Sequence, residues 1–557
     1  MTPLPDNVIE YSKKAAESFI QTAVFIDDRI YKGATKTLAP KAPIEAPKSR
    51  KRAIKSAEKN DKLETNQKQD PVEEDPSPDT YDIVHYFAKK QIVCSLYQPK
   101  QDASVAPQSD IFPLCKAADI VIVDWDLYGD KGKKAQELVD GLIKQAVEDV
   151  PEQLRLILIY TQELNLQAVA NEIYETVYKS IGDVFQPVDG DEGLVFYTQN
   201  SRVVVLGKPG RERPEPYARF TVNEKDLADV AIGEFAKLAS GILHAATLMG
   251  LAEIRKNSRK ILSKFNSNLD PAFLTHLAMC LPLEDASSHV IPLLVSEIES
   301  VLEDVLPTPL LSTKLIENWV DSVWKPGDHL ETLFEKKGVD YRSVAKILCT
   351  KGFKEAIKQE DKVPNINAEK DKTKKIRKAA QILMPSAESD TNQRFSHLMA
   401  SRTFYGGKAK ALKLGSVVYN RERDRFLLCV QPICDSVRLR YERIFVFLQM
   451  EKSNGGSSDG ASHIVIKADD TVQELVYQAK SYRCFTASFK PDIGSGEVLA
   501  YTDEQGDLVF EDIVGSKYYW ADQLRTSHAQ RAVEQFASDL SRVGLTESEW
   551  LRRLEPK

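Results

Sequence analysis

The chain has 557 residues and a formal net charge of −7, with 42% hydrophobic and 28% charged residues. This length suggests roughly three domains of ~150 residues. The composition is that of a globular protein, and the modest acidic charge argues against wholesale coating of nucleic acid. No apolar run approaches the ~18 residues that a membrane span needs. The N-terminus lacks a signal-peptide pattern, and the seven cysteines are scattered rather than arranged as a disulfide framework. We therefore expect a protein of the reducing cytoplasm.

The first elements are a helix, a strand and a long polar insertion. Residues 6–20 have helical spacing and lead into the apolar run AVFI at 23–26. Residues 33–79 are rich in Lys, Ala, Pro, Glu and Asp and poor in large apolar residues. Such a segment cannot bury enough apolar surface to become ordered, so we expect a disordered insertion. Its Lys/Arg cluster could contact nucleic acid, but a solvated linker is the simpler explanation.

After the insertion, apolar runs alternate with amphipathic segments. The runs are IVCSLY, IVIV, LRLILIY and VVVLG, beginning at residues 92, 120, 154 and 203. Between them, segments such as KKAQELVDGLIKQAV have apolar residues at helical spacing. This alternation predicts an α/β fold with a doubly wound parallel sheet. The turn residues DGDEG within 182–200 predict a small hairpin before the last run.

The rest of the chain changes character twice. Residues 223–265 predict a long helical stretch with a break near Gly241 or Gly250, and residues 266 to about 400 look all-helical. From 412 to 520, short apolar runs joined by Asn, Gly, Asp and Ser turns predict a mainly antiparallel sheet or small barrel, followed by a closing helix. We therefore expect three domains, at 1–240, 241–400 and 401–557.

Polar residues follow the apolar runs of the first region at the point where each run ends. They are Asp27 and Asp28, Asp124, Thr161 and Lys208. The carboxyl ends of parallel strands converge on one crevice, so these side chains are expected to meet there. Clustered carboxylates are costly unless a cation neutralises them, and Mg²⁺ prefers oxygen ligands. A carboxylate can also accept a phosphoryl group as a nucleophile.

This order of residues resembles the receiver domain of two-component response regulators. The resemblance implies a flavodoxin-like fold for residues 1–240, with 33–79 as an insertion, and a partner histidine kinase as phosphodonor. It implies that Asp124 is the phosphoacceptor, Thr161 the switch hydroxyl and Lys208 the partner of the phosphoryl group. It also implies that Mg²⁺ is held by Asp27, Asp28, Asp124 and the backbone carbonyl of Asp126. Each residue alone has a simpler explanation, since an Asp after a strand often caps a helix.

A second resemblance concerns the wider role. The same acidic motif followed by AEIRKNSRKILSKF and LLCVQPICDSVRL is similar to receiver proteins of Detocs-type anti-phage phosphorelays in bacteria. In that family one receiver protein carries a nucleosidase-like effector domain, and another acts as a decoy that draws phosphate from the effector. Residues 266–557 carry no nucleoside phosphorylase signature. The resemblance therefore implies a decoy or buffer of the signal, sharing its kinase with a companion effector.

Two other classes of function stay open. KGVDYRSVAKILCTKGFKEAI at 337–357 could form a helix-turn-helix of a DNA-binding transcriptional regulator, although a charged helix face is the simpler explanation. The C-terminal half could instead be an effector under the control of phosphorylation. Whether the chain is an enzyme is left open, and beyond its own phosphorylation and autodephosphorylation we predict no activity. No membrane partner is expected.

Overall fold

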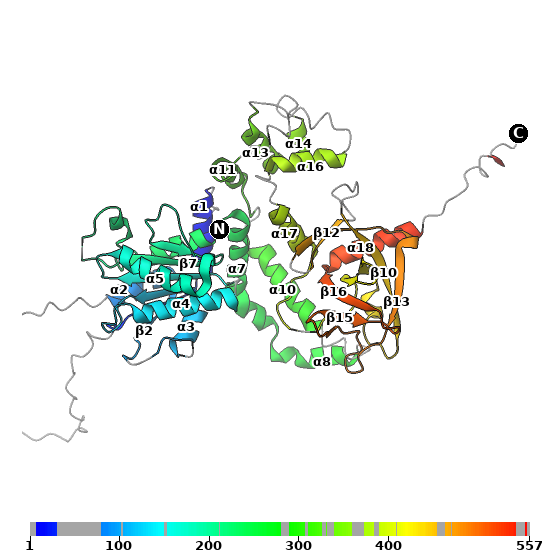
Figure 1. The fold of residues 1–557 in the computed structure, drawn as a ribbon, viewed down its shortest axis with the longest axis horizontal. Helices are drawn as coiled ribbons and strands as arrows, with labels where there is room; N and C mark the ends of the chain where they lie inside the picture. Colours follow the sequence, from blue (N-terminus) through cyan, green and yellow to red (C-terminus); the bar gives the residue numbers. More distant parts are fainter. Residues whose placement is uncertain are drawn as a thin grey trace, which may run out of the picture. The chain divides into compact units, whose positions relative to one another are not determined.

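The structure is a computed structural model in which the chain divides into two compact units, Met1–Val323 and Trp324–Lys557 (Figure 1). Most of the predicted insertion 33–79 lies outside the residues that the structure describes. Those residues are 7–30, 79–101, 104–107, 109–149, 153–210, 212–279, 289–306, 310–325, 330, 339–358, 372–383, 389–407, 409–453, 463–468, 471–541 and 552–553.

The N-terminal unit is built on a seven-stranded sheet in the order β2-β1-β3-β4-β7-β6-β5. The first five strands in this order are parallel, and β6 and β5 extend the sheet antiparallel. This order confirms the predicted doubly wound sheet, and the β5–β6 hairpin confirms the one expected within 182–200. The bounds are β1 Thr22–Ile26, β2 Val93–Tyr97, β3 Ile120–Asp124, β4 Arg155–Thr161, β5 Gln186–Pro187, β6 Val195–Tyr197 and β7 Ser201–Gly207.

Helices cover both faces of this sheet. The connection from β1 to β2 crosses the sheet in one direction, and those from β2 to β3, β3 to β4 and β4 to β7 cross in the other. Right-handed crossovers therefore place α2 on one face and α3, α4 and α5 on the opposite face. Helix α6 contacts α2 and α1, so it lies on the α2 face. The bounds are α1 Val8–Phe19, α2 Thr80–Lys89, α3 Ile111–Ala117, α4 Lys133–Glu148, α5 Leu166–Ile181 and α6 Leu227–Leu238.

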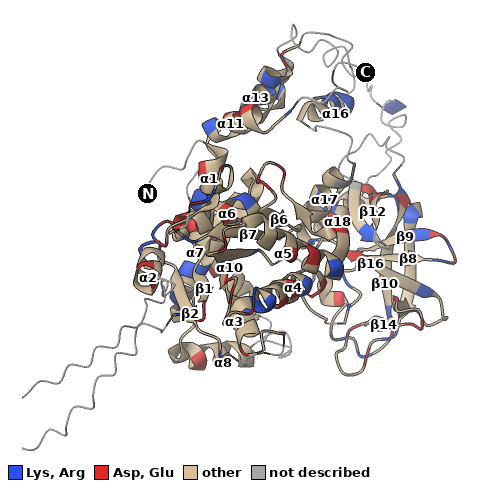
Figure 2. Cartoon of the chain, turned by 60° about the vertical axis from the view of Figure 1, so that its left-hand side comes forward, with Lys and Arg blue, Asp and Glu red and all other residues tan. Residues whose placement is uncertain are grey.

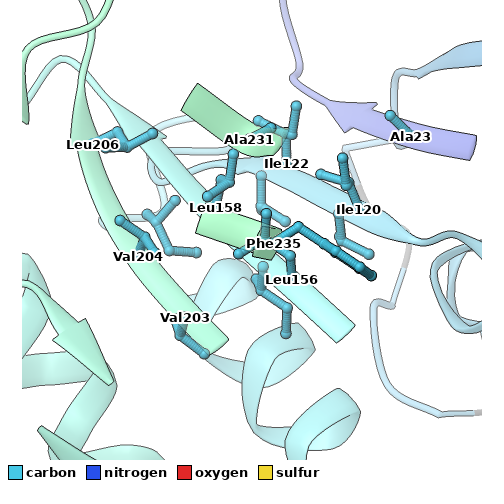
Figure 3. Close-up of a cluster of buried hydrophobic side chains, with 14 of the residues drawn as sticks. Ala23, Ile120, Ile122, Leu156, Leu158, Val203, Val204, Leu206, Ala231 and Phe235 are labelled. Atoms are coloured by element: carbon cyan, nitrogen blue, oxygen red, sulfur yellow. The ribbon is translucent and has the colours of Figure 1, made fainter. Parts of the chain in front are cut away.

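The strands of this sheet are continuous apolar runs because both faces are covered. All residues of β3, β4 and β7 are buried. The register places Ile122, Leu158 and Val204 in one row across these strands. Figure 3 shows Ala231 and Phe235 of α6 lying over this row. Packing in this layer fixes the strands side by side, and so fixes where their carboxyl ends meet.

Beyond α6 the N-terminal unit is helical. The break predicted near Gly241 or Gly250 occurs at Gly241, which has φ 121° and precedes α7, whereas Gly250 lies inside α7. Helix α10 packs on α7, and α11 packs on α1. The helices are α7 Ile242–Lys264, α8 Asp270–Met279, α10 Val290–Val305 and α11 Thr313–Ser322. Short 3-10 segments are η1 Gly182–Val184, η2 Tyr217–Phe220 and η3 Ser267–Leu269.

The C-terminal unit contains a nine-stranded sheet in which every pairing of named strands is antiparallel, as predicted. One apolar cluster includes Leu448 of β10 and Ala529 of α18, and another includes Phe447 of β10 and Tyr518 of β16. The strands are β8 Ser416–Asn420, β9 Arg425–Cys429, β10 Arg443–Lys452, β11 His463–Ala468, β12 Thr471–Tyr477, β13 Cys484–Phe489, β14 Tyr501–Thr502, β15 Leu508–Glu511 and β16 Lys517–Gln523. The helices of this unit are α13 Tyr341–Lys351, α14 Phe353–Ile357, α16 Lys372–Leu383, α17 Ser389–Ala400 and α18 Thr526–Leu540, with 3-10 segments η5 Ile433–Asp435 and η7 Ser481–Arg483.

The surface of the described chain carries charges of both signs. Figure 2 shows Lys and Arg interspersed with Asp and Glu over the helices of the N-terminal unit. Among the described helices, none combines the length and the apolar character needed to cross a bilayer. The division into domains at 1–240, 241–400 and 401–557 stays a prediction.

Candidate phosphoacceptor site

Three carboxylates meet at the carboxyl ends of β1 and β3. Strand β1 is followed by Asp27 and Asp28, and β3 ends at Asp124. The strands are parallel neighbours with Ile26 opposite Val123, so the residues after them share one edge of the sheet. One oxygen from each carboxylate lies within 4.8 Å of the others, and the three residues are 0%, 3% and 2% exposed. We refer to Asp27, Asp28 and Asp124 as the carboxylate cluster.

Lys208 brings a positive charge to this cluster from the end of β7. Its Nζ lies 2.8 Å from Asp27 Oδ2 and 2.9 Å from Asp124 Oδ1. Strand β4 lies between β3 and β7, and the ammonium passes 5.5 Å from the ring centroid of Tyr160 in β4. The side chain is only 3% exposed, so it is held in place. The residues that follow or end β1, β3 and β7 therefore meet at one place, as the sequence pattern predicted.

Arg29 is a second cation in the site, and the sequence pattern did not single it out. Its Nη2 lies 3.3 Å from Asp124 Oδ2, and its Nε lies 3.8 Å from both Asp27 Oδ1 and Asp28 Oδ1. Its backbone N–H donates a 2.8 Å hydrogen bond to Asp27 Oδ1. The available signal was its position directly after the acidic pair, where the chain turns over the strand ends. Three carboxylates and two cations leave the site with a formal charge of −1.

Burial makes Asp124 harder to ionise than an ordinary aspartate. Removal from water raises the pKa of Asp124 from 3.8 to about 6, with Lys208 acting in the opposite direction and Asp27 adding to the rise. The carboxylate is therefore charged at neutral pH, but its charge is poorly solvated. A buried, poorly solvated carboxylate of this kind is stabilised by an additional cation close to it.

Thr161 ends β4, the neighbour of β3, and Asp126 follows Asp124 by two residues; the side chains of both make contacts outside the cluster. Thr161 ends β4 and is 1% exposed, and its Oγ1 accepts a 3.1 Å hydrogen bond from the Glu163 backbone N–H. Its carbonyl accepts a 2.7 Å hydrogen bond from the Lys208 backbone N–H. Asp126 Oδ1 accepts a hydrogen bond of 2.9 Å from the Lys131 backbone N–H, so this carboxylate faces the loop before α4. Among the described residues, the cluster of carboxylates does not include Asp126.

A second arginine that the sequence did not indicate ties two of the loops together. Arg213 is 7% exposed and donates to the carbonyls of Glu163 at 2.8 Å and Lys208 at 2.9 Å. It also donates to the carbonyl of Thr161 at 3.3 Å. A Cβ on Gly207 would lie 2.4 Å from its guanidinium, so a side chain at this position would displace Arg213 from these contacts. Arg213 therefore links the loop after β4, which follows the predicted switch residue Thr161, to the loop after β7, which contains Lys208.

The turn after Asp124 is fixed by close packing. Trp125 is 3% exposed, and its indole lies where a side chain at Gly132 would be, with a Cβ only 2.1 Å from the ring. Gly132 has φ 83°, a conformation that L residues with a side chain rarely adopt. The ring and the glycine together hold the segment between Asp124 and α4.

The donor set of the cluster fits a hard divalent cation. All three side chains offer carboxylate oxygens, which are the ligands Mg²⁺ prefers, and their oxygens already converge. The poorly solvated charge of Asp124 would be offset by such an ion. The site can therefore bind a cation next to Asp124, a buried carboxylate that could act as a nucleophile.

The comparisons with known proteins point to one family for this part of the chain. Residues 19–213 match the family model described as the response receiver domain. The match runs from the end of α1 to Arg213, so it includes all five parallel strands and every residue of the site described above. No curated protein and no solved structure matches the chain.

Proposed function

Residues 19–213 form a response-regulator receiver domain, and from this premise we propose that the chain accepts a phosphoryl group from a histidine kinase on the carboxylate of Asp124. The observation that carries the proposal is the setting of that carboxylate. It is buried at a strand end, lies 2.9 Å from the Lys208 ammonium and shares its surroundings with Asp27 and Asp28. An ordinary helix cap or surface aspartate would not be enclosed in this way.

The transfer is an in-line displacement at phosphorus. An oxygen of Asp124 attacks the phosphoryl group of a phosphohistidine, the phosphorus–nitrogen bond breaks, and its electron pair stays with the imidazole of the kinase. The product on this chain is an acyl phosphate. Asp124 must be ionised to attack, and burial raises its pKa to about 6. Protonation of Asp124 at acidic pH should therefore slow acceptance.

The other residues of the site position and neutralise the transferred group. Lys208 lies close enough to Asp124 to pair with a phosphoryl oxygen bound there. The hydroxyl of Thr161 is the group expected to turn toward that oxygen. Asp27, Asp28, Asp124 and the carbonyl of Asp126 would hold Mg²⁺, which when bound offsets negative charge on the phosphoryl oxygens. Positioning and electrostatics account for most of the rate in such transfers.

The wider role we propose is that of a decoy or buffer in a bacterial anti-phage phosphorelay of the Detocs type. The support is the resemblance of the sequence and the lack of a nucleoside phosphorylase signature in residues 266–557. In this role the chain takes phosphate from a cytoplasmic kinase that it shares with a companion effector. We further propose that the receiver occupies residues 1–240, with a helical domain at 241–400 and a β-rich domain at 401–557.

The proposal is tested by intact mass measurement of the full chain after incubation with acetyl phosphate and Mg²⁺, or with the cognate kinase as donor. Wild type should gain a phosphate adduct, and Asp124→Asn should not. Asp183→Asn is the matched control, because Asp183 is an exposed carboxylate of the same domain that contacts Tyr178 rather than the site. An adduct that persists in Asp124→Asn, or a wild type that takes no phosphate from either donor, contradicts the proposal.

A further inference from the structure

The position of Arg29 sets this site apart from a cluster of carboxylates with a single lysine. Its guanidinium is within 3.8 Å of an oxygen from each member of the cluster, Asp27, Asp28 and Asp124. It therefore faces the same carboxylates that would bind a divalent ion. A guanidinium stays positively charged at every accessible pH, so Arg29 cannot lose its positive charge by deprotonation.

Mg²⁺ and the Arg29 guanidinium need the same space. Mg²⁺ binds carboxylate oxygens at about 2.0–2.1 Å and holds near-octahedral geometry, usually keeping several waters. Such an ion and its waters would occupy the volume in front of the three carboxylates, where the Arg29 guanidinium now lies. With Arg29 in place the site carries a formal charge of −1. With Lys208 as its single cation the charge would be −2, which is the charge that one divalent ion neutralises.

Of the two cations, Arg29 is the one that can leave. The Lys208 side chain is 3% exposed and lies against Tyr160, and it forms contacts of 2.8 and 2.9 Å with two carboxylates. The Arg29 side chain is 13% exposed, with its Nη2 3.3 Å from Asp124 Oδ2 and its Nε 3.8 Å from Asp27 Oδ1 and Asp28 Oδ1. Exchange of Arg29 for an ion therefore moves a side chain that already reaches solvent, whereas Lys208 is enclosed.

We propose that Arg29 is a built-in competitor of Mg²⁺. In the metal-free domain it offsets one negative charge of the carboxylate cluster, and it must swing out of the cluster when the ion binds. Arg29 thereby lowers the affinity for the ion and sets the concentration of Mg²⁺ at which the site becomes competent. The use of the ion in phosphoryl acceptance rests on the proposed function, but the competition itself needs only these side chains.

The affinity test is calorimetric titration of Mg²⁺ into the full-length wild type, Arg29→Gln and Arg219→Gln. Arg219→Gln removes the same charge from an exposed arginine that pairs with Asp191 and Glu192, outside the site. Arg29→Gln should bind Mg²⁺ on the order of tenfold more tightly, because a cation next to the ligands opposes a second one strongly. Arg219→Gln should match wild type. Equal or weaker binding by Arg29→Gln overturns the proposal.

A second variant and a second measurement guard against misfolding and against a purely long-range charge effect. Arg29→Lys keeps the charge on a shorter side chain, so its affinity should fall between those of wild type and Arg29→Gln. If Arg29→Gln does not fold, an Arg29→Lys affinity no tighter than wild type overturns the proposal. In wild type, Mg²⁺ should also increase modification of Arg29 by phenylglyoxal, mapped by mass spectrometry. Unchanged or reduced modification contradicts displacement.

The outcomes also separate this inference from the proposed function. If wild type is phosphorylated on Asp124 while wild type and Arg29→Gln bind Mg²⁺ equally, the competition is wrong and the receiver function stands. If Arg29→Gln binds Mg²⁺ more tightly but no protein accepts phosphate, the competition stands and the receiver function fails. Binding that is unchanged in Asp28→Asn would place the ion elsewhere and overturn the inference.

Discussion

Replacing Asp124 by its neutral isostere asparagine should make the metal-free protein more stable. Asp124 has a pKa of about 6 in the folded protein, compared with 3.8 for an ordinary aspartate. Between these values the folded state binds more protons than the unfolded state, so the free energy of unfolding falls as the pH rises. Above pH 6 Asp124 is ionised in both states, and the folded state bears the full cost of burying its charge. Asparagine at this position cannot ionise, so the folded state does not bear that cost.

The size of the effect follows from the two pKa values. They differ by about two pH units, and each unit corresponds to about 1.36 kcal/mol. At pH 8 without metal, Asp124→Asn should therefore raise the free energy of unfolding by up to about 3 kcal/mol. At pH 4 the gain should largely disappear, because Asp124 is then mostly protonated. Mg²⁺ should narrow the difference at pH 8, because the proposed binding of the ion to the folded wild type would stabilise it.

Hydrogen–deuterium exchange of the full chain measures this difference in one domain without isolating it. The buried amides of β4 report opening of the receiver core. They should exchange up to about a hundredfold more slowly in Asp124→Asn at pH 8 in a chelator, since 1.4 kcal/mol is a factor of ten. Asp183→Asn should change exchange by no more than about twofold. Equal or faster exchange in Asp124→Asn, or a gain that grows toward acidic pH, would refute the reasoning.

Two further predictions concern packing and thiol chemistry. Gly132→Ala should destabilise the receiver by at least about 2 kcal/mol, because the new Cβ would lie 2.1 Å from Trp125 at a positive φ; β4 amide exchange as slow as in wild type would contradict this. Iodoacetamide at pH 8 should modify the exposed Cys434 well before Cys115 and Cys429, whose pKa burial raises to about 12, and peptide mapping that finds the reverse order would show that the buried thiols are accessible.

The fold of the receiver and the meeting of its charged residues could be predicted because both depend on local patterns. Apolar runs with polar ends identified β1, β3, β4 and β7, and the parallel arrangement then required Asp27, Asp124 and Lys208 to share an edge. Gly241 likewise marked a helix break through its own backbone preference.

The roles of Arg29 and Arg213 could not be found in this way. Arg29 matters because its turn directs the side chain back over the strand ends, toward Asp124, which is 95 residues away. Arg213 matters because its partners are backbone carbonyls, including that of Thr161, 52 residues away. Backbone acceptors carry no sequence signal, and the direction of a turn side chain depends on packing around it. Such contacts become visible when the loops are placed in three dimensions.

The β5–β6 hairpin has a consequence for how this domain can associate with itself. A parallel sheet that stopped at β7 would present a row of open backbone groups to which another chain could add a strand. Here β6 pairs along β7, and the sheet ends in the two-residue β5, which contains Pro187. Proline has no N–H to donate, and so short a strand offers little length for pairing. This edge therefore offers a second copy of the receiver little backbone with which to extend the sheet.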